Sequence, residues 1–111
     1  MANHTDRYGL PPNPWGGEGE IVKGAVKEVL EASKRYLNKP PKSVSVLDVG
    51  SGHGEYSTEM AKFFWNVTGV EPFEDAYKTA VQKKGESKNL KFFHSKIEDF
   101  KSKTKFDLVT H

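Results

Sequence analysis

The stretch that decides the fold reads Val44-Ser45-Val46-Leu47-Asp48-Val49 and continues as Gly50-Ser51-Gly52-His53-Gly54. Its first part is short, β-branched and mostly apolar, which is typical of a strand buried on both faces of a parallel sheet. Its second part predicts a sharp turn, because glycine lets the backbone bend tightly and lets a ligand approach without a Cβ in the way. We expect a helix to follow from about residue 55 to residue 64, with Tyr56, Met60, Phe63 and Phe64 on its inner face.

Strands and helices alternate around this stretch. Apolar residues at helical spacing predict a helix over residues 21–37, which the two prolines at positions 40 and 41 end. Further expected elements are strands at 66–70, 90–94 and 106–110, a helix from Pro72 (at its N1 position) to about Lys84, and one turn at 97–100. This order predicts an α/β fold, with a Rossmann-like parallel sheet, flanking helices and right-handed crossovers.

The first twenty residues differ from the rest of the chain. Six prolines and glycines fall between residues 11 and 19, and such a composition resists both helix and sheet. We therefore interpret residues 1–20 as an irregular arm and residues 21–111 as one domain. Trp15, in the middle of the arm, either packs back on the domain as a surface anchor or belongs to a lid over a bound ligand.

Composition excludes several classes of protein. The chain has 111 residues, a net charge of +2 and no cysteine, which rules out disulfides and thiolate metal sites and suits a reducing compartment. No apolar run is long enough to span a membrane, and residues 1–6 lack the features of a secretory signal. We therefore expect a cytoplasmic protein with no membrane partner and no metal site.

Lysines are concentrated in residues 78–105, which hold nine lysines against three acids. Two interpretations stay open for this segment. One is a solvated surface, typical of such charge runs, and the other is a basic docking surface for RNA or another polyanion. The segment has no arginine and no obvious platform for base stacking, which weakens the second interpretation.

A nucleoside-shaped ligand suits the carboxyl ends of these strands. Glu71 follows the strand at 66–70, and a carboxylate there can accept hydrogen bonds from both hydroxyls of a ribose. We expect the glycine turn to present its amides to the ligand, and the helix after it offers unpaired N–H groups to an anionic ligand group. A dinucleotide site would need a glycine where Glu55 stands, and a carboxylate there faces a pyrophosphate unfavourably.

These motifs resemble those of class I S-adenosylmethionine-dependent methyltransferases. Residues 46–54 are similar to the family's first motif, and residues 67–72 (V-T-G-V-E-P) to its acidic ribose-binding step. Residues 92–100 are similar to the segment that lines the adenine, and residues 106–109 (F-D-L-V) to the fourth strand. The resemblance spans residues 44–111 and implies methyl transfer with S-adenosyl-L-methionine as cofactor. It also implies the strand order 3-2-1-4, which is the first half of the family's seven-stranded sheet.

The resemblance implies a role for each motif residue. The glycines would line the methionine and ribose, Asp48 would steady the turn, and Glu71 would hold the ribose hydroxyls. The cofactor-binding residues implied in this way are Asp48, Gly50, Ser51, Gly52, Gly54, Glu71, Pro72, Phe73, Ile97 and Glu98. Lys96 stands where many members have an aspartate that binds the adenine amino group, and an ammonium group cannot accept that hydrogen bond.

His111 is the one catalytic candidate that the resemblance offers. It ends the predicted fourth strand, where the family often places substrate or catalytic groups. The sequence does not identify a general base, and it predicts the methyl acceptor only as a class, either a small molecule or, alternatively, RNA or protein.

The last predicted strand, residues 106–110, is an apolar edge with no charge, proline or bulge to blunt it. We therefore expect a partial methyltransferase domain, the cofactor-binding half of a larger protein, which can self-associate along this edge. Two other functions stay open. One is a catalytically silent cofactor-binding or assembly module of the same fold, and the other is an NAD(P)-binding oxidoreductase domain.

Overall fold

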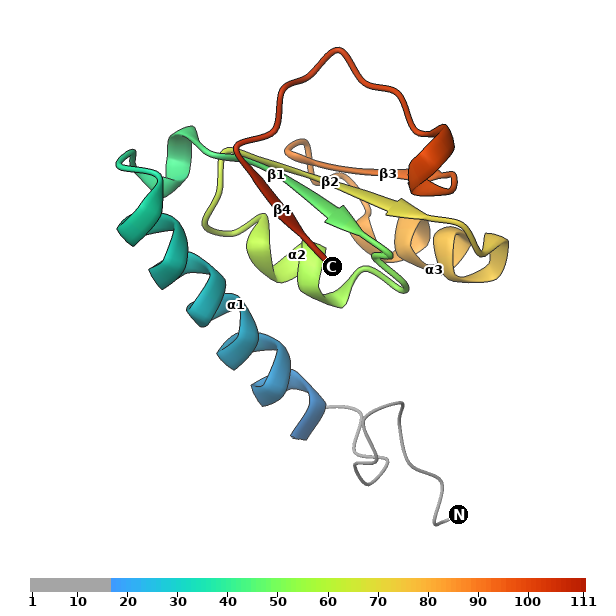
Figure 1. Cartoon of the computed structure of the whole chain (residues 1–111). Helices are drawn as coiled ribbons and strands as arrows, with labels where there is room; N and C mark the ends of the chain where they lie inside the picture. Colours follow the sequence, from blue (N-terminus) through green and yellow to red (C-terminus); the bar gives the residue numbers. More distant parts are fainter. Residues whose placement is uncertain (1–16) are drawn as a thin grey trace.

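Four parallel strands form one sheet in the order β3-β2-β1-β4, as predicted, in a computed structural model that describes residues 17–111 (Figure 1). The elements are α1 (Gly17–Tyr36), the 3₁₀ turn η1 (Pro41–Ser43), β1 (Ser45–Val49), α2 (Glu55–Met60), β2 (Asn66–Glu71), α3 (Glu74–Lys84), β3 (Leu90–His94), the 3₁₀ turn η2 (Ile97–Asp99) and β4 (Leu108–Thr110). Val46 of β1 lies opposite Val67 of β2 on one side and Leu108 of β4 on the other. The predicted role of Trp15 lies outside the described residues.

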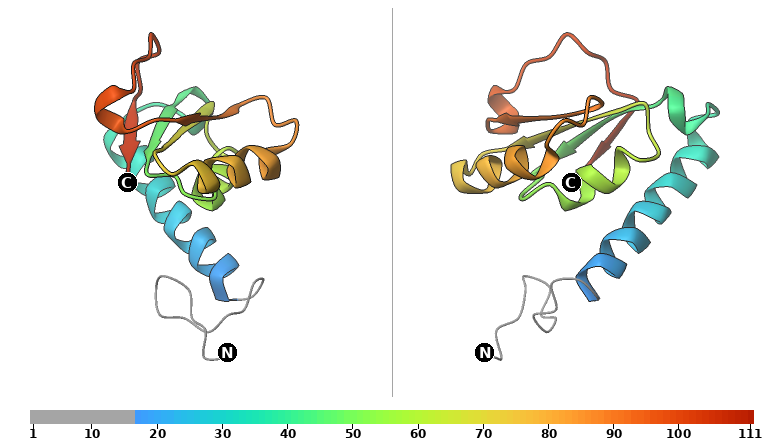
Figure 2. Two further views of the ribbon diagram at one scale, coloured as in Figure 1. Left: turned by 90° about the vertical axis from the view of Figure 1, so that its right-hand side faces the viewer. Right: turned by 180° about the vertical axis from the view of Figure 1, so that it is seen from behind.

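All three helices cover the same face of the sheet (Figure 2). Because side chains alternate along a strand, Val46, Val67 and Leu90 point to this face. They form one buried core with side chains from the helices and from the loop after α2, namely Val22, Val26, Met60, Phe64 and Ala80. The apolar stripe of α1 therefore ties the start of the described chain to the sheet.

The opposite face of the sheet is covered more thinly. The connection between β3 and β4, drawn in orange and red, arches over it in place of a helix of full length (Figure 1). Phe100 of this connection packs on Phe93 of β3 with ring centroids 5.4 Å apart. Phe93 and Val109 on this face remain 43% and 55% exposed. One face of the sheet is thus a packed core and the other is half open.

Several predicted boundaries were wrong. Residues 17–20, assigned to the irregular arm, are helical and begin α1, where Glu20 suits the positive end of the helix dipole. The helix predicted over 55–64 ends at Met60, because the chain tightens into a turn whose Ala61 carbonyl accepts a hydrogen bond from Asn89 Nδ2 (2.8 Å). Phe63, predicted to face inward, is consequently 38% exposed.

The start of α3 also differs from the prediction. Pro72 is not its N1 residue; Phe73 is the N-cap and the helix begins at Glu74. Glu71 Oε2 accepts the Phe73 N–H at 2.9 Å, which fixes the chain in an extended conformation just before the helix. Within residues 17–111, no helix is both long enough and apolar enough to cross a membrane.

Candidate functional site

The glycine turn between β1 and α2 uses left-handed backbone at three positions. Gly50, Gly52 and Gly54 have φ values of 72°, 59° and 88°, which residues with a Cβ rarely adopt. Gly54 is also confined by packing, since a Cβ there would lie 2.7 Å from Cζ of Phe92. The predicted glycine pattern is thus required by backbone geometry and, at Gly54, by close contact with the core.

The amides of this turn bind protein acceptors, contrary to our expectation that they would face the ligand. Gly50 N–H and Ser51 N–H both donate to the Val70 carbonyl, at 2.8 and 3.2 Å. Gly52 N–H donates to Glu71 Oε1 at 2.7 Å. These three bonds fasten the turn to the end of β2, so a ligand would meet the turn through its bare Cα atoms.

Glu71 holds two turns together at the end of β2. One carboxylate oxygen accepts the Gly52 N–H and the other accepts the Phe73 N–H, and the residue is 4% exposed. Each oxygen of an ionised carboxylate has a second lone pair. Glu71 therefore acts as a buried brace that keeps capacity for further hydrogen bonds.

Asp48 makes a similar brace on the other side of the turn. Its Oδ2 accepts a hydrogen bond from Ser57 Oγ of α2 at 2.6 Å, and its Oδ1 accepts one from Thr110 Oγ1 of β4 at 3.2 Å. Ser57 is fully buried and Asp48 is 6% exposed. No local pattern marks Ser57 or Thr110 as partners of Asp48, because both reach it only once α2 and β4 pack against β1.

Two cavities flank the glycine turn. The smaller, of about 280 Å³, lies between α1, α2 and the ends of β1 and β4, and its wall includes Asp48, Ser51, Tyr56, Thr110 and His111. The larger, of about 450 Å³, lies between the ends of β1 and β2 and the segment after β3, with Val49, Pro72, Phe73, Lys96, Ile97 and Glu98 in its wall. Gly50 belongs to both walls.

Most of the predicted site residues therefore meet around one turn. The cavity walls contain Asp48, Gly50, Ser51, Pro72, Phe73, Ile97, Glu98 and His111. Gly52, Gly54 and Glu71 lie in neither wall and act as supports of the turn. Phe73 is 74% exposed, so its ring is available to a ligand in the larger cavity.

Two features of the turn suit an elongated ligand that runs through both cavities. A Cβ at Gly50 would meet no atom of residues 17–111 within 4 Å, so space is open at the point that the two cavity walls share. Ser51 Oγ, in the wall of the smaller cavity, is buried and has no hydrogen-bond partner within the described part of the chain. A buried hydroxyl without a partner costs about 1–3 kcal/mol, a cost that a polar ligand atom would remove.

Charge in the cavities is sparse and mixed. Lys96 and Glu98 stand in the wall of the larger cavity, and Asp48 and His111 in that of the smaller. Within residues 17–111 no group of three or more histidines, aspartates or glutamates is arranged to hold a metal ion. The arrangement is that of a binding site for an organic molecule with polar and aromatic parts.

Comparison with known proteins identifies similar domains. A family model described as a methyltransferase domain matches residues 46–111. Human EEF1A lysine methyltransferase 2 is 37% identical over 78% of this chain. Among solved structures, Streptomyces venezuelae DesVI is similar with a TM-score of 0.63 and 26% identity, over 84% of this chain and 37% of that one.

A third relative was crystallised with a ligand. Magnesium protoporphyrin IX methyltransferase from Synechocystis PCC 6803, with bound SAH, has a TM-score of 0.61 to this chain at 23% identity, over 82% of this chain and 41% of that one. The present chain spans only 36% of the length of its human relative. These likenesses concern the part of such proteins that contains β1 to β4.

Proposed function

Because the chain belongs to the class I S-adenosylmethionine-dependent methyltransferase family, we propose that its two cavities hold the two halves of S-adenosyl-L-methionine. The observation that carries the proposal is Gly50, which is part of both cavity walls and leaves the passage between them open. The buried, unpartnered hydroxyl of Ser51 supports it, since the amino-acid end of the cofactor is rich in donors and acceptors.

Each half of the cofactor has matching residues in this proposal. The larger cavity would take the adenine, with the exposed ring of Phe73 and the side chain of Ile97 as apolar contacts. The smaller cavity would take the methionine part, beside Asp48 and Ser51. Glu71 would receive the ribose hydroxyls on the lone pairs that Gly52 and Phe73 leave free.

We further propose that the longer protein of which such a domain forms part methylates a lysine side chain of a protein. The support is the 37% identity to human EEF1A lysine methyltransferase 2. A lysine must lose a proton before its nitrogen can attack a methyl group, so this acceptor calls for a general base. His111, in the wall of the smaller cavity, is the candidate that the described residues offer. A cytoplasmic location remains our prediction.

The first test is a calorimetric titration of the chain with S-adenosylmethionine, S-adenosylhomocysteine and NAD. We expect the two adenosyl compounds to bind and NAD not to bind. Glu71→Ala should weaken S-adenosylmethionine binding by about 1–3 kcal/mol, the usual cost of losing a charged hydrogen bond. Glu86→Ala, an exposed carboxylate in the loop after α3, is the matched control and should bind as the wild type does.

Two outcomes would contradict the proposal. NAD binding without binding of the adenosyl compounds would favour the oxidoreductase alternative, and unchanged affinity of Glu71→Ala would remove Glu71 from the site. Binding alone does not distinguish an enzyme from a silent module. Transfer of a labelled methyl group to extract proteins, followed by amino-acid analysis, separates these two, and label in methyl-lysine is the expected result.

We also propose that the chain self-associates through β4. This strand is at the edge of the sheet in the described residues, and Val109 on it is 55% exposed. Edges of this kind pair with other strands unless they are blunted. Sedimentation at micromolar concentration should show a dimer, and a clean monomer across the concentration range would refute the proposal.

A further inference from the structure

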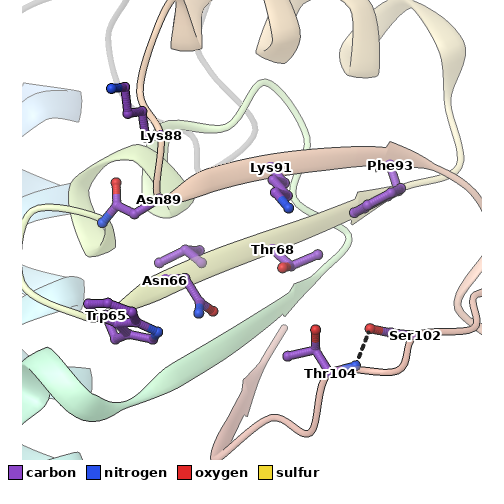
Figure 3. Close-up of a pocket in the computed structure, with 10 residues that line it drawn as sticks. Trp65, Asn66, Thr68, Lys88, Asn89, Lys91, Phe93, Ser102 and Thr104 are labelled. Atoms are coloured by element: carbon purple, nitrogen blue, oxygen red, sulfur yellow. Dashed lines mark hydrogen bonds between the residues drawn. The ribbon is translucent and has the colours of Figure 1, made fainter.

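A groove of about 400 Å³ lies outside the cofactor site, on the half-open face of the sheet (Figure 3). It begins at the amino ends of β2 and β3 and is bounded by Ser102 and Thr104 of the connection that precedes β4. We call it the β2–β3 groove. The residues that matter for its chemistry are Trp65, Asn66, Thr68, Lys88, Lys91 and Phe93.

Two exposed aromatic rings stand at opposite ends of the groove. Figure 3 shows Trp65 where β2 begins and Phe93 towards the end of β3, and they are 61% and 43% exposed. Phe93 lies opposite Val70 of β2. Val70 is five residues beyond Trp65, which directly precedes β2, so the two rings are separated by about 17 Å along the strand direction. At the 3.4 Å rise of stacked nucleotides in one strand, that length corresponds to about five nucleotides.

The charge around these rings is positive. Lys88 and Lys91 line the groove, no aspartate or glutamate is in its wall, and Lys101, Lys103 and Lys105 follow on the bounding connection. All five lysines are exposed, and none forms an ion pair with a carboxylate of residues 17–111. Lys88 and Lys91 therefore give the groove itself unneutralised positive charge, and the lysines of the connection add to the positive charge of its surroundings.

Uncharged polar groups lie between the two rings. Asn66 and Thr68 come from β2, and Ser102 and Thr104 face them from the connection, where Thr104 N–H donates to Ser102 Oγ at 3.0 Å. Hydroxyl and amide side chains both donate and accept, as does the 2′-hydroxyl of RNA. Such groups discriminate ribose from deoxyribose along a bound strand.

We propose that the β2–β3 groove binds single-stranded RNA. Bases stack on Trp65 and Phe93, phosphates meet Lys88 and Lys91, and the polar groups between them contact the ribose. An acidic peptide would also complement the lysines, but it would leave Trp65, and the part of Phe93 that Phe100 does not cover, without a flat partner. The sequence alone showed no stacking platform, because Trp65 lies outside the lysine-rich segment and joins it only through the pairing of β2 with β3.

The test is fluorescence anisotropy of a labelled oligouridylate of about ten nucleotides, a length within the range of single-strand sites, titrated with the full chain at several salt concentrations. We expect binding whose logarithm falls linearly with the logarithm of salt concentration. Trp65→Ala should lower the affinity about 5- to 150-fold, the loss of one stacked base, and leave that slope unchanged. Lys88→Gln/Lys91→Gln should reduce the slope by about 1.4, which corresponds to two phosphate contacts.

Matched controls keep the test decisive. Lys23→Gln/Lys27→Gln removes the same charge from exposed positions of α1 and should bind as the wild type does. Trp65→Ala should keep the wild-type circular dichroism and S-adenosylmethionine affinity, since Trp65 is exposed and remote from the cofactor cavities. Failure of cofactor binding would thus not contradict RNA binding in the groove, and failure of RNA binding would not contradict the proposed cofactor site.

Four results would overturn the inference. They are no binding at low salt, equal weakening by the α1 control pair, tighter binding of the matching DNA oligonucleotide, and displacement of the RNA by an equal concentration of a glutamate-rich peptide. The last result would assign the groove to an acidic protein segment instead.

Discussion

Carboxylates hold the sheet at both ends of β1, but in opposite environments. At the carboxyl end, Asp48 and Glu71 are almost fully buried, and each accepts hydrogen bonds from two other parts of the chain. At the amino end, Asp107 keeps a side chain that is 31% exposed and binds Lys39 Nζ (3.1 Å) and the Ser45 N–H (2.9 Å). Burying a charged group lowers stability unless the group is fully hydrogen-bonded. The carboxylates are buried at the end of β1 where each of their oxygens accepts a hydrogen bond, and this is also the end that carries the proposed site.

Asp48→Ala should have the largest effect on stability. It removes two hydrogen bonds to a charged group and leaves Ser57 Oγ, which is fully buried, without its acceptor. At about 1.5–3 kcal/mol for each such bond, we expect a loss of about 4 kcal/mol in the free energy of unfolding, measured by urea denaturation.

Asp48→Asn is the informative companion, because its amide oxygen still accepts the Ser57 hydroxyl and Thr110 Oγ1 can turn to accept from its NH₂ group. It should lose about 1 kcal/mol. Asp75→Ala, at an exposed position in the first turn of α3, controls for loss of a carboxylate elsewhere. Equal losses of stability in Asp48→Ala and Asp75→Ala would contradict the larger contribution that we assign to a buried, hydrogen-bonded carboxylate.

Gly54→Ala should rank second. Its φ of 88° is unfavourable for alanine, and the new Cβ would lie 2.7 Å from Cζ of the buried Phe92. Left-handed strain and overpacking together predict a loss of about 3 kcal/mol in urea denaturation. Gly24→Ala gives the opposite sign, since Gly24 lies within α1 with no atom near its Cβ position, and a gain of about 1 kcal/mol is expected. A tolerated Gly54→Ala would show that the turn has room to shift.

Asp107→Asn should have the smallest effect, and its pH dependence identifies the cause. The Ser45 N–H, and then the Lys39 ammonium group, hold the pKa of Asp107 below its ordinary value. A depressed pKa in the folded state contributes stability above the unfolded pKa of about 3.9, and that contribution is lost as pH falls through the folded pKa. The difference in Tm between wild type and Asp107→Asn should therefore be present at neutral pH and vanish in acid.

High salt should also shrink that difference, because the ion pair with Lys39 is partly exposed and is screened. A difference that stays constant from neutral pH to acid would mean that the amide disturbs packing and that charge has no part in it.

Local pattern was enough to predict the strands and the glycine turn. The β-branched runs of β1 and β2, the spacing of glycines 50, 52 and 54, and the acid at the end of β2 each depend on a few adjacent residues. Element ends were less predictable. The start of α1 at Gly17 and the end of α2 at Met60 depend on helix-end electrostatics and on the distant Asn89.

The partners of the site residues could not be predicted in the same way. Asp48 meets Thr110 across a sequence separation of 62 residues, and the Glu71 carboxylate takes a turn amide that we expected to face the ligand. The β2–β3 groove likewise exists only because two neighbouring strands bring Trp65 and Lys91 into the wall of one groove. Such contacts join residues that are distant in the sequence and form only in the packed fold. Patterns of adjacent residues in a single sequence do not predict them.

The pairing of β1 with β4 bears on how the chain is made. Val46 of β1 cannot pair with Leu108 of β4 until the ribosome has added Leu108, 62 residues later. At ordinary elongation rates this takes about 3–12 s. During that interval one side of a very apolar strand lacks its backbone partner and is open to chaperones or to neighbouring nascent chains. Slow codons between those of β1 and β4 would lengthen this exposure, so the yield of folded protein should depend on how fast that segment is translated.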